Sequence, residues 1–202
     1  YPYMTGLVAG AFVLSSLYHV FNVERLKEIA RYALVFSFAL LPVAMMPLML
    51  HLMQPFRGIH VLMTPHFTSA ISAFGIVFMT YAVIVAAEIW FVYRKFIVDS
   101  IHRLNNKPDR SGLESLLLPI YKIISLGAMD ISKEALHSDH KAVKFLAGVG
   151  IPVACFLHGY AGFIFGSVKA NALWMTPLMP VIFICSAVVS GIALCIVSYY
   201  IF

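Results

Sequence analysis

Three histidines and an arginine are clustered in one short segment, residues 51–69, where their side chains could bind a polar ligand and move protons. The segment contains His51, Arg57, His60 and His66, and so holds three of the eight histidines of the chain. Histidine has a pKa near neutrality, which suits a group that accepts and releases protons. Arginine is a permanent cation that can hold a carbonyl or an anion. Because the segment lies between two long apolar runs, we expect a re-entrant connection at the edge of a membrane.

The composition of the chain is that of an integral membrane protein. Of its 202 residues, 61% are hydrophobic and 11% are charged, and the mean hydropathy is +0.90. Soluble domains contain roughly 45–50% apolar and about 25% charged residues, which argues against a water-soluble fold. The net charge of +5 does not indicate a nucleic-acid partner, because membrane proteins concentrate Lys and Arg in cytoplasmic loops.

Five segments are apolar over the roughly 20 residues that a helix needs to cross a bilayer. They predict an all-α, polytopic transmembrane helix bundle, and they cover residues 3–21, 32–50, 67–93, 143–166 and 173–202. The first segment contains Gly6 and Gly10 in a GxxxG pattern, which allows two helices to approach closely. The chain begins and ends within apolar sequence, so we expect residues 1–202 to be one membrane domain and a fragment of a longer subunit.

The distribution of basic residues predicts how the bundle is oriented. If the five segments alternate, the connections after the first and third segments lie on one side, and they carry 12 of the 14 Lys and Arg residues. Only Arg57 and Lys169 lie on the other side. By the positive-inside rule, in a chain of the inner (cytoplasmic) membrane, loops 23–31 and 94–142 are cytoplasmic and loops 51–66 and 167–172 are periplasmic or extracellular.

The long connection 94–142 is predicted to contain a cytoplasmic amphipathic helix. Ser111 and Glu114 fit a capping box. Apolar residues then follow at helical spacing: Leu113, Leu116, Leu117, Ile120, Ile123 and Ile124. We expect this helix to lie on the inner membrane surface. A second short helix is predicted to begin near Asp130.

Two polar residues inside the predicted spans each need a partner or a function. Glu88 is the only acid within a span and falls about 30 Å from the start of the third segment, at 1.5 Å per residue. It is interpreted either as an interfacial acid within an aromatic belt or, like His51, as a proton relay. His158 falls in the outer half of the fourth span. It is either a helix–helix hydrogen-bonding group or part of one site with His51, His60 and His66.

Two kinds of ligand fit these histidines. A quinone needs an apolar cleft, hydrogen-bond donors and a group that accepts protons. Alternatively, His51 and His158 are the axial ligands of a b-type haem. We favour the quinone, because cytochrome b bundles usually offer a histidine pair for each haem and only one plausible pair is present. A secondary transporter is a further alternative, although we detect none of the inverted repeats expected of that class.

The cysteines indicate no metal site. Cys155, Cys185 and Cys195 all lie in apolar runs, without a CxxC or a Cys/His spacing. This pattern predicts neither an iron–sulfur cluster nor a zinc site in this chain.

Several blocks of the sequence resemble the NrfD/PsrC-like membrane subunits, the polysulfide reductase NrfD family. The first two are QPFRGIH at 54–60 and PHFTSAIS at 65–72. A more specific run, HGYAGFIFG at 158–166, LWMTPLMPVIF at 173–183 and SAVVSG at 186–191, most resembles the DsrP type of the DsrMKJOP complex. Members of the family have more helices, about 8–10 spans of roughly 20 residues each.

The resemblance implies a quinone- or quinol-interacting membrane anchor of a respiratory electron-transfer complex. Its substrate would be menaquinone or another quinone, and the chain would carry no haem, iron–sulfur cluster or other metal cofactor. The implied partners are a periplasmic ferredoxin-like iron–sulfur subunit, a multihaem cytochrome c and a second membrane subunit, in sulfur or sulfite metabolism.

The resemblance also implies which residues bind the quinone. The positions carried over are Arg57, His60, Thr68, Ser69, His158 and Tyr160. The chain departs from the family pattern at His51, where relatives keep an acid, and at Ala73 and Phe74, where an acid often follows the Thr-Ser motif. A proton route through those acids would therefore differ here or use histidine.

Overall fold

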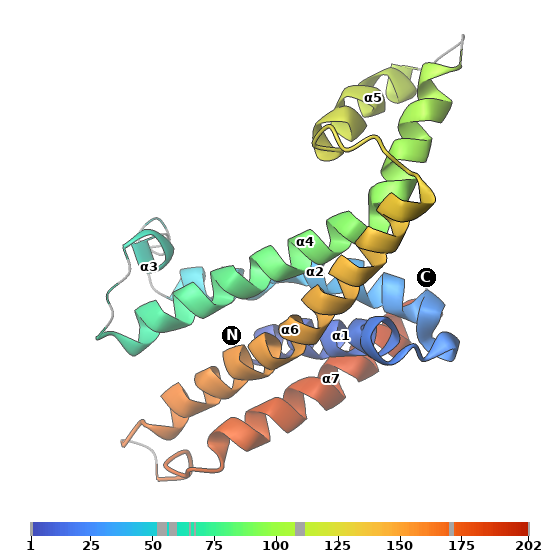
Figure 1. The fold of residues 1–202 in the computed structure, drawn as a ribbon. Helices are drawn as coiled ribbons and strands as arrows, with labels where there is room; N and C mark the ends of the chain where they lie inside the picture. The colour runs from blue at the N-terminus through green and yellow to red at the C-terminus, as the bar shows by residue number, and fades with distance from the viewer. Residues whose placement is uncertain are drawn as a thin grey trace.

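The computed structural model describes residues 2–51, 56, 60–64, 66, 68–107, 112–169 and 172–201. Within these ranges the regular structure is helical, and five helices are long and apolar enough to cross a membrane. The predicted all-α, polytopic bundle is thereby confirmed. The elements are α1 (Pro2–Phe21), the 3-10 turn η1 (Glu24–Leu26), α2 (Lys27–His51), α3 (His60–Met63), α4 (Ala70–Asn105), α5 (Gly112–Ile124), α6 (Lys133–Gly166) and α7 (Met179–Ile201) (Figure 1).

The bundle has two ends of different character (Figure 1). We call the end that carries residues 22–31, 106–107 and 112–132 the basic end, because Lys and Arg gather around it. The opposite end, which carries the connections before α4 and before α7, is the distal end. α1, α4 and α7 run from the distal to the basic end, and α2 and α6 run back.

α1 is the central helix of the bundle. It packs against α2, α6 and α7, and such burial requires small residues at the crossing points. A Cβ built on Gly10 would lie 2.2 Å from the backbone oxygen of Ala187 and 2.7 Å from the Cα of Gly191. The GxxxG pattern therefore does mark a close helix contact, and the partner surface on α7 is centred on Gly191.

Two long helices extend into the predicted connection 94–142, one from each end. α4 continues to Asn105, and α6 begins at Lys133 behind the N-cap Ser132. The predicted span limits at residues 93 and 143 assumed that a helix ends where charged residues begin. Charged residues mark where a helix leaves the bilayer, but Lys, Arg and Glu are good helix formers and do not end it. The short helix predicted near Asp130 is the first part of α6.

The predicted amphipathic helix is present as α5. Its Leu118 is buried against Ile97, Ile101 and Leu104 of α4, and the indole N–H of Trp90 donates to the carbonyl of Ile124 at 2.8 Å. Leu117 and Tyr121 are half-buried, and five further large apolar residues of α5 are exposed, namely Leu113, Leu116, Ile120, Ile123 and Ile124. Ser111 of the predicted capping box lies outside the described residues. α5 is therefore fixed to the projecting part of α4 with an open apolar face.

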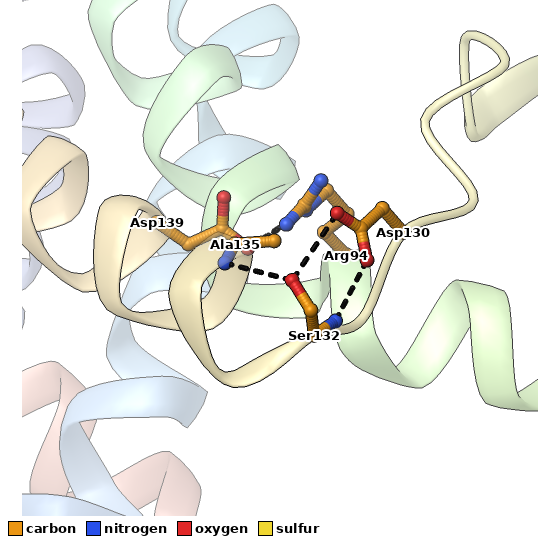
Figure 2. Close-up of polar contacts among 5 residues, drawn as sticks. All are labelled: Arg94, Asp130, Ser132, Ala135 and Asp139. Carbon is orange, nitrogen blue, oxygen red and sulfur yellow. Dashed lines mark hydrogen bonds and ion pairs between the residues drawn. The ribbon is translucent and has the colours of Figure 1, made fainter.

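At the basic end an ion pair joins α4 to α6, and a helix cap forms the start of α6 (Figure 2). The Arg94 guanidinium meets the Asp139 carboxylate, with Nη2–Oδ2 at 2.6 Å and Nε–Oδ2 at 2.7 Å. Ser132 Oγ accepts the backbone N–H of Ala135 at 3.2 Å, and Asp130 accepts the N–H of Ser132 at 2.8 Å. These contacts determine where α6 begins.

The fifth span also begins later than predicted. The sequence placed its start at Leu173, but α7 begins at Met179, after a stretch that contains Pro177. Proline lacks a backbone N–H and is best accommodated in the first turn of a helix, where Pro180 lies.

Candidate functional site

Histidine and hydroxyl side chains form a polar rim at the distal end, immediately before α4. His60 begins α3 and is exposed. His66 Nδ1 lies 2.9 Å from Thr68 Oγ1, and the backbone N–H of His66 donates to Ser72 Oγ at 2.7 Å. Ser69 caps α4, because its Oγ accepts the N–H of Ser72 at 3.5 Å. These local bonds hold the imidazole of His66 and the hydroxyls of Thr68 and Ser69 at the entrance to α4.

Tyr160 of α6 lies close to the depth of this rim. Gly150 of α6 is level with Ile84 of α4, because a Cβ on Gly150 would lie 3.3 Å from Ile84 Cγ2. The two helices are antiparallel, so Tyr160, ten residues after Gly150, is level with Phe74, ten residues before Ile84. Both side chains belong to one apolar cluster. Ser69 is five residues beyond Phe74, about 7.5 Å along the helix axis. Tyr160 and the Thr68–Ser69 pair therefore lie at comparable depth in the distal part of the bundle.

His158 faces away from Tyr160. It lies two residues before Tyr160, which is roughly 200° of helix rotation. A Cβ on Gly6 would lie 3.0 Å from its Nε2, and its ring centroid is 5.6 Å from that of Phe183. The residue is 4% exposed, and its Nδ1 has no hydrogen-bond partner among the described residues. The adjoining cavity of about 10 Å³ has room for at most one water molecule. A quinone contact at His158 stays a prediction.

A larger cavity, of about 420 Å³, lies at the distal ends of α6 and α7. Its walls include Phe163, Ser167, Thr176 and Pro180. Phe163 also ends an aromatic row along α6, in which Phe156, Tyr160 and Phe163 have neighbouring centroids 5.8 and 6.0 Å apart. Phe156 and Phe163 are 58% and 56% exposed, so the row lies on the outer surface of the bundle. It connects this surface with both Tyr160 and the cavity.

Two predicted site residues are not tested by these contacts. Arg57 lies outside the described residues. His51 ends α2, but its side chain lies outside the described part of the structure. The haem ligation by His51 and His158 therefore stays an untested alternative. Among the described residues, no group of three or more His, Cys, Asp or Glu side chains could hold a metal ion.

Glu88 is buried in the bundle and does not lie at a solvated interface. It is 0% exposed, and neither carboxyl oxygen has a hydrogen-bond partner in the described part of the chain. An unpaired polar group at membrane depth is costly and marks a functional position. Glu88 lies well away from the distal rim, closer to the basic end of α4.

The distal site combines an apolar surface with a few polar groups. This combination suits a flat, apolar molecule with polar oxygens, because the aromatic side chains can hold the ring while the hydroxyls and the imidazole bind the oxygens. Sequence reasoning missed the cavity between α6 and α7. The combination of Gly166 with Thr176 and Pro177 was a usable signal, since it indicates a close turn between two spans.

The family model described as "Polysulphide reductase, NrfD" matches residues 1–202. The chain is 33% identical over 204 residues to a selenate reductase subunit of Mesobacillus selenatarsenatis, covering 100% of this chain and 46% of that protein. It is 24% identical over 199 residues to the Hdr-like menaquinol oxidoreductase integral membrane subunit of Archaeoglobus fulgidus, covering 98% of this chain and 40% of that protein. The chain thus spans less than half the length of these relatives.

Proposed function

The chain belongs to the NrfD family, and from that premise we propose that it forms the quinone-interacting part of a membrane subunit in an electron-transfer complex. Family membership and the name of the menaquinol oxidoreductase relative support this role. The expected substrate is menaquinone or a related quinone. The proposed site is the space between the distal ends of α4 and α6.

The observation that carries this proposal is the position of Tyr160. Its side chain is level with Phe74 in the shared apolar cluster, and Ser69 lies little more than one turn further out. The row Phe156–Tyr160–Phe163 leads from the lipid-facing surface to this position. A quinone needs this arrangement, because it enters sideways from the bilayer and its ring carries two polar oxygens.

Each residue has a distinct proposed role. Tyr160 and Ser69 donate hydrogen bonds to the quinone oxygens, and Thr68 positions the imidazole of His66. A bound quinol supplies two electrons and two protons when it is oxidised. The exposed His60 and His66 receive protons at the distal end, because a ring nitrogen of imidazole can accept a proton from a bound quinol. Arg57 and His158 remain predicted quinone contacts, and His51 a predicted proton relay.

The partners and orientation belong to the same proposal. The positive-inside rule favours a cytoplasmic basic end, which places the quinone site towards the periplasm in an inner-membrane protein. An iron–sulfur subunit on that side would exchange electrons with the quinone, accompanied by a multihaem cytochrome c and a second membrane subunit. The DsrP-like block supports a sulfur substrate, whereas the name of one relative refers to selenate.

Replacement of Tyr160 tests the proposed site. In the purified complex, Tyr160→Phe removes one hydrogen-bond donor and keeps the ring. We expect quinol-dependent electron transfer to fall several-fold, since a hydrogen bond typically contributes about 0.5–1.5 kcal/mol. Tyr200→Phe is the matched control, because Tyr200 is 91% exposed and lies at the basic end. Equal activity of the two variants would exclude Tyr160 as a quinone ligand.

Cofactor analysis of the co-purified complex tests the proposed iron–sulfur partner and the alternative of a b-type haem in this subunit. We expect iron–sulfur signals from a partner subunit and no b-type haem in the pyridine haemochrome of this subunit. A stoichiometric b haem that is lost on replacement of His158 would favour the haem-binding alternative instead.

A further inference from the structure

Several buried polar atoms of the bundle have no hydrogen-bond partner, and three of the residues concerned lie towards the basic end. They are Ser15 Oγ, His19 Nε2 and both carboxyl oxygens of Glu88, none with a partner among the residues that the structure describes. Ser15 and Glu88 are 0% exposed and His19 is 5% exposed. A buried unpaired polar group costs several kcal/mol in hydrocarbon. The presence of these three buried polar side chains therefore indicates a function.

A cavity of about 190 Å³ opens beside His19 at the basic end. Tyr18 and His19 of α1, Arg31 of α2, Val92 and Lys95 of α4, and Asp139, His140 and Val143 of α6 line it. Asp139 is occupied by its ion pair with Arg94. The remaining charged and titratable groups that face His19 are thus Arg31, Lys95 and His140, one from each neighbouring helix.

The helix register places Ser15 and Glu88 at one depth, directly inward of this cavity. His19 and Val92 line the same cavity. Ser15 is four residues before His19, and Glu88 is four residues before Val92. Since α1 and α4 run in the same direction, each lies one turn, about 6 Å, deeper on the same helix face. The residues that carry the unpaired atoms therefore lie at successive depths between the cavity and the interior of the bundle, with His19 next to the cavity and Ser15 and Glu88 one turn deeper.

This series of polar residues ends at Glu88, because the next layer of side chains towards the distal end is closely packed. A Cβ on Gly150 would lie 2.4 Å from Phe12 Cζ and 3.3 Å from Ile84 Cγ2. Closer to the distal end, the hydroxyl of Tyr81 donates a hydrogen bond to the backbone carbonyl of Val8 at 3.4 Å. The side of Glu88 that faces the distal end thus meets this apolar layer and the side chain of Tyr81, whose hydroxyl already donates to Val8. The side that faces the basic end carries the polar groups.

We propose that Glu88 is a proton-binding site that is loaded from the basic end through His19. A proton from water in the cavity adds to Nδ1 of His19, and a second proton leaves from the buried Nε2. It then passes to a carboxylate oxygen of Glu88, with the hydroxyl of Ser15 bridging the two, and neutral His19 is restored. The reverse sequence returns the proton, and no electrons are transferred. This inference goes beyond the proposed function, because it needs no quinone and concerns the opposite end of the bundle.

Infrared spectroscopy of the intact complex in lipid tests this inference. A protonated carboxyl has a carbonyl stretch apart from the amide bands, and this band shifts when its proton is exchanged for deuterium. We expect one such band to be absent in Glu88→Gln and moved in Glu88→Asp. The time course after transfer to D2O then measures how fast Glu88 exchanges its proton with bulk water.

The His19→Phe variant tests the route, with His137→Phe as the matched control. His137 is an exposed residue of α6 outside the cavity. We expect exchange at Glu88 to slow at least about tenfold in His19→Phe, because a positioned acid–base group typically contributes more than that, and to be unchanged in His137→Phe. Exchange as fast in His19→Phe as in the wild type would overturn the route. A spectrum in which neither Glu88 variant changes a carboxyl band would overturn the site.

The design separates this inference from the quinone proposal. If the complex with Glu88→Gln fails to assemble, the shifted carboxyl band of Glu88→Asp still shows that the band comes from residue 88. The His19→Phe and His137→Phe variants retain Glu88, so the exchange rate can be compared without changing the carboxyl itself. Exchange is measured without quinol turnover. A failed quinone assignment at Tyr160 therefore leaves the result at Glu88 standing, and the reverse also holds.

Discussion

Arg94 and Asp139 form a buried ion pair that joins α4 to α6 at the basic end, with Nη2 of the arginine 2.6 Å from Oδ2 of the aspartate (Figure 2). The two residues are 7% and 8% exposed. Arg94 also lies over the ring of Trp90, 6.0 Å from its centroid. α4 and α6 extend beyond the apolar core. The ion pair therefore joins them where they make fewer hydrophobic contacts.

Removal of this charge pair is expected to destabilise the bundle. Asp139→Asn leaves the guanidinium of Arg94 buried without a counter-ion, which typically costs about 3–5 kcal/mol. The exposed pair Lys107–Glu114 at 2.6 Å is the control, and Lys107→Gln should cost at most about 1 kcal/mol. Denaturant unfolding in detergent measures both free energies. Equal costs for the two variants would contradict a structural role for Arg94–Asp139.

The crossing of α1 and α7 is expected to tolerate no side chain at Gly10. Gly10→Ala places a methyl group 2.2 Å from the backbone oxygen of Ala187, so the two helices must separate. Overpacking of this kind costs about 1–3 kcal/mol or more. Gly148→Ala is the matched control, because a Cβ there meets no atom within 4 Å. Thermal unfolding of the two variants should differ clearly, and identical transitions would refute the close crossing.

The open apolar face of α5 is expected to contact lipid. Leu116 is 67% exposed on that face, and a spin label at Leu116→Cys should collide more often with oxygen than with a water-soluble relaxation agent. A label at Lys122→Cys, an exposed basic position of the same helix, should show the opposite preference. If both labels prefer the water-soluble agent, α5 does not lie on the membrane surface.

Much of the fold follows from the sequence, because membrane insertion depends on quantities that are local in the chain. Runs of about 20 apolar residues predicted the five spans, and apolar periodicity predicted α5. Helix ends were harder to predict. Neither Arg94 nor Lys141 ends a helix, since hydropathy shows where a segment leaves the bilayer and not where its hydrogen bonds stop. The end of α4 depends instead on packing against Leu118 of α5, which is a tertiary contact.

The candidate site was predicted less completely, because helix rotation decides which residues meet. His158 and Tyr160 are two residues apart and were assigned to one site, yet His158 faces Gly6 of α1. His19 belongs to no site that the sequence predicted. Its relation to Glu88 depends on the register of α1 against α4, which the sequence does not contain.

Photolabelling with an azido-quinone tests the central claim most directly. The complex would be illuminated with the bound probe, digested, and the modified residues of this chain identified by mass spectrometry. We predict labels at the distal end, on the Phe156–Phe163 part of α6 and on the residues around Thr68–Ser69, with less label in Tyr160→Phe. Label confined to the basic end, around Tyr18 and Lys95, would contradict a distal quinone site.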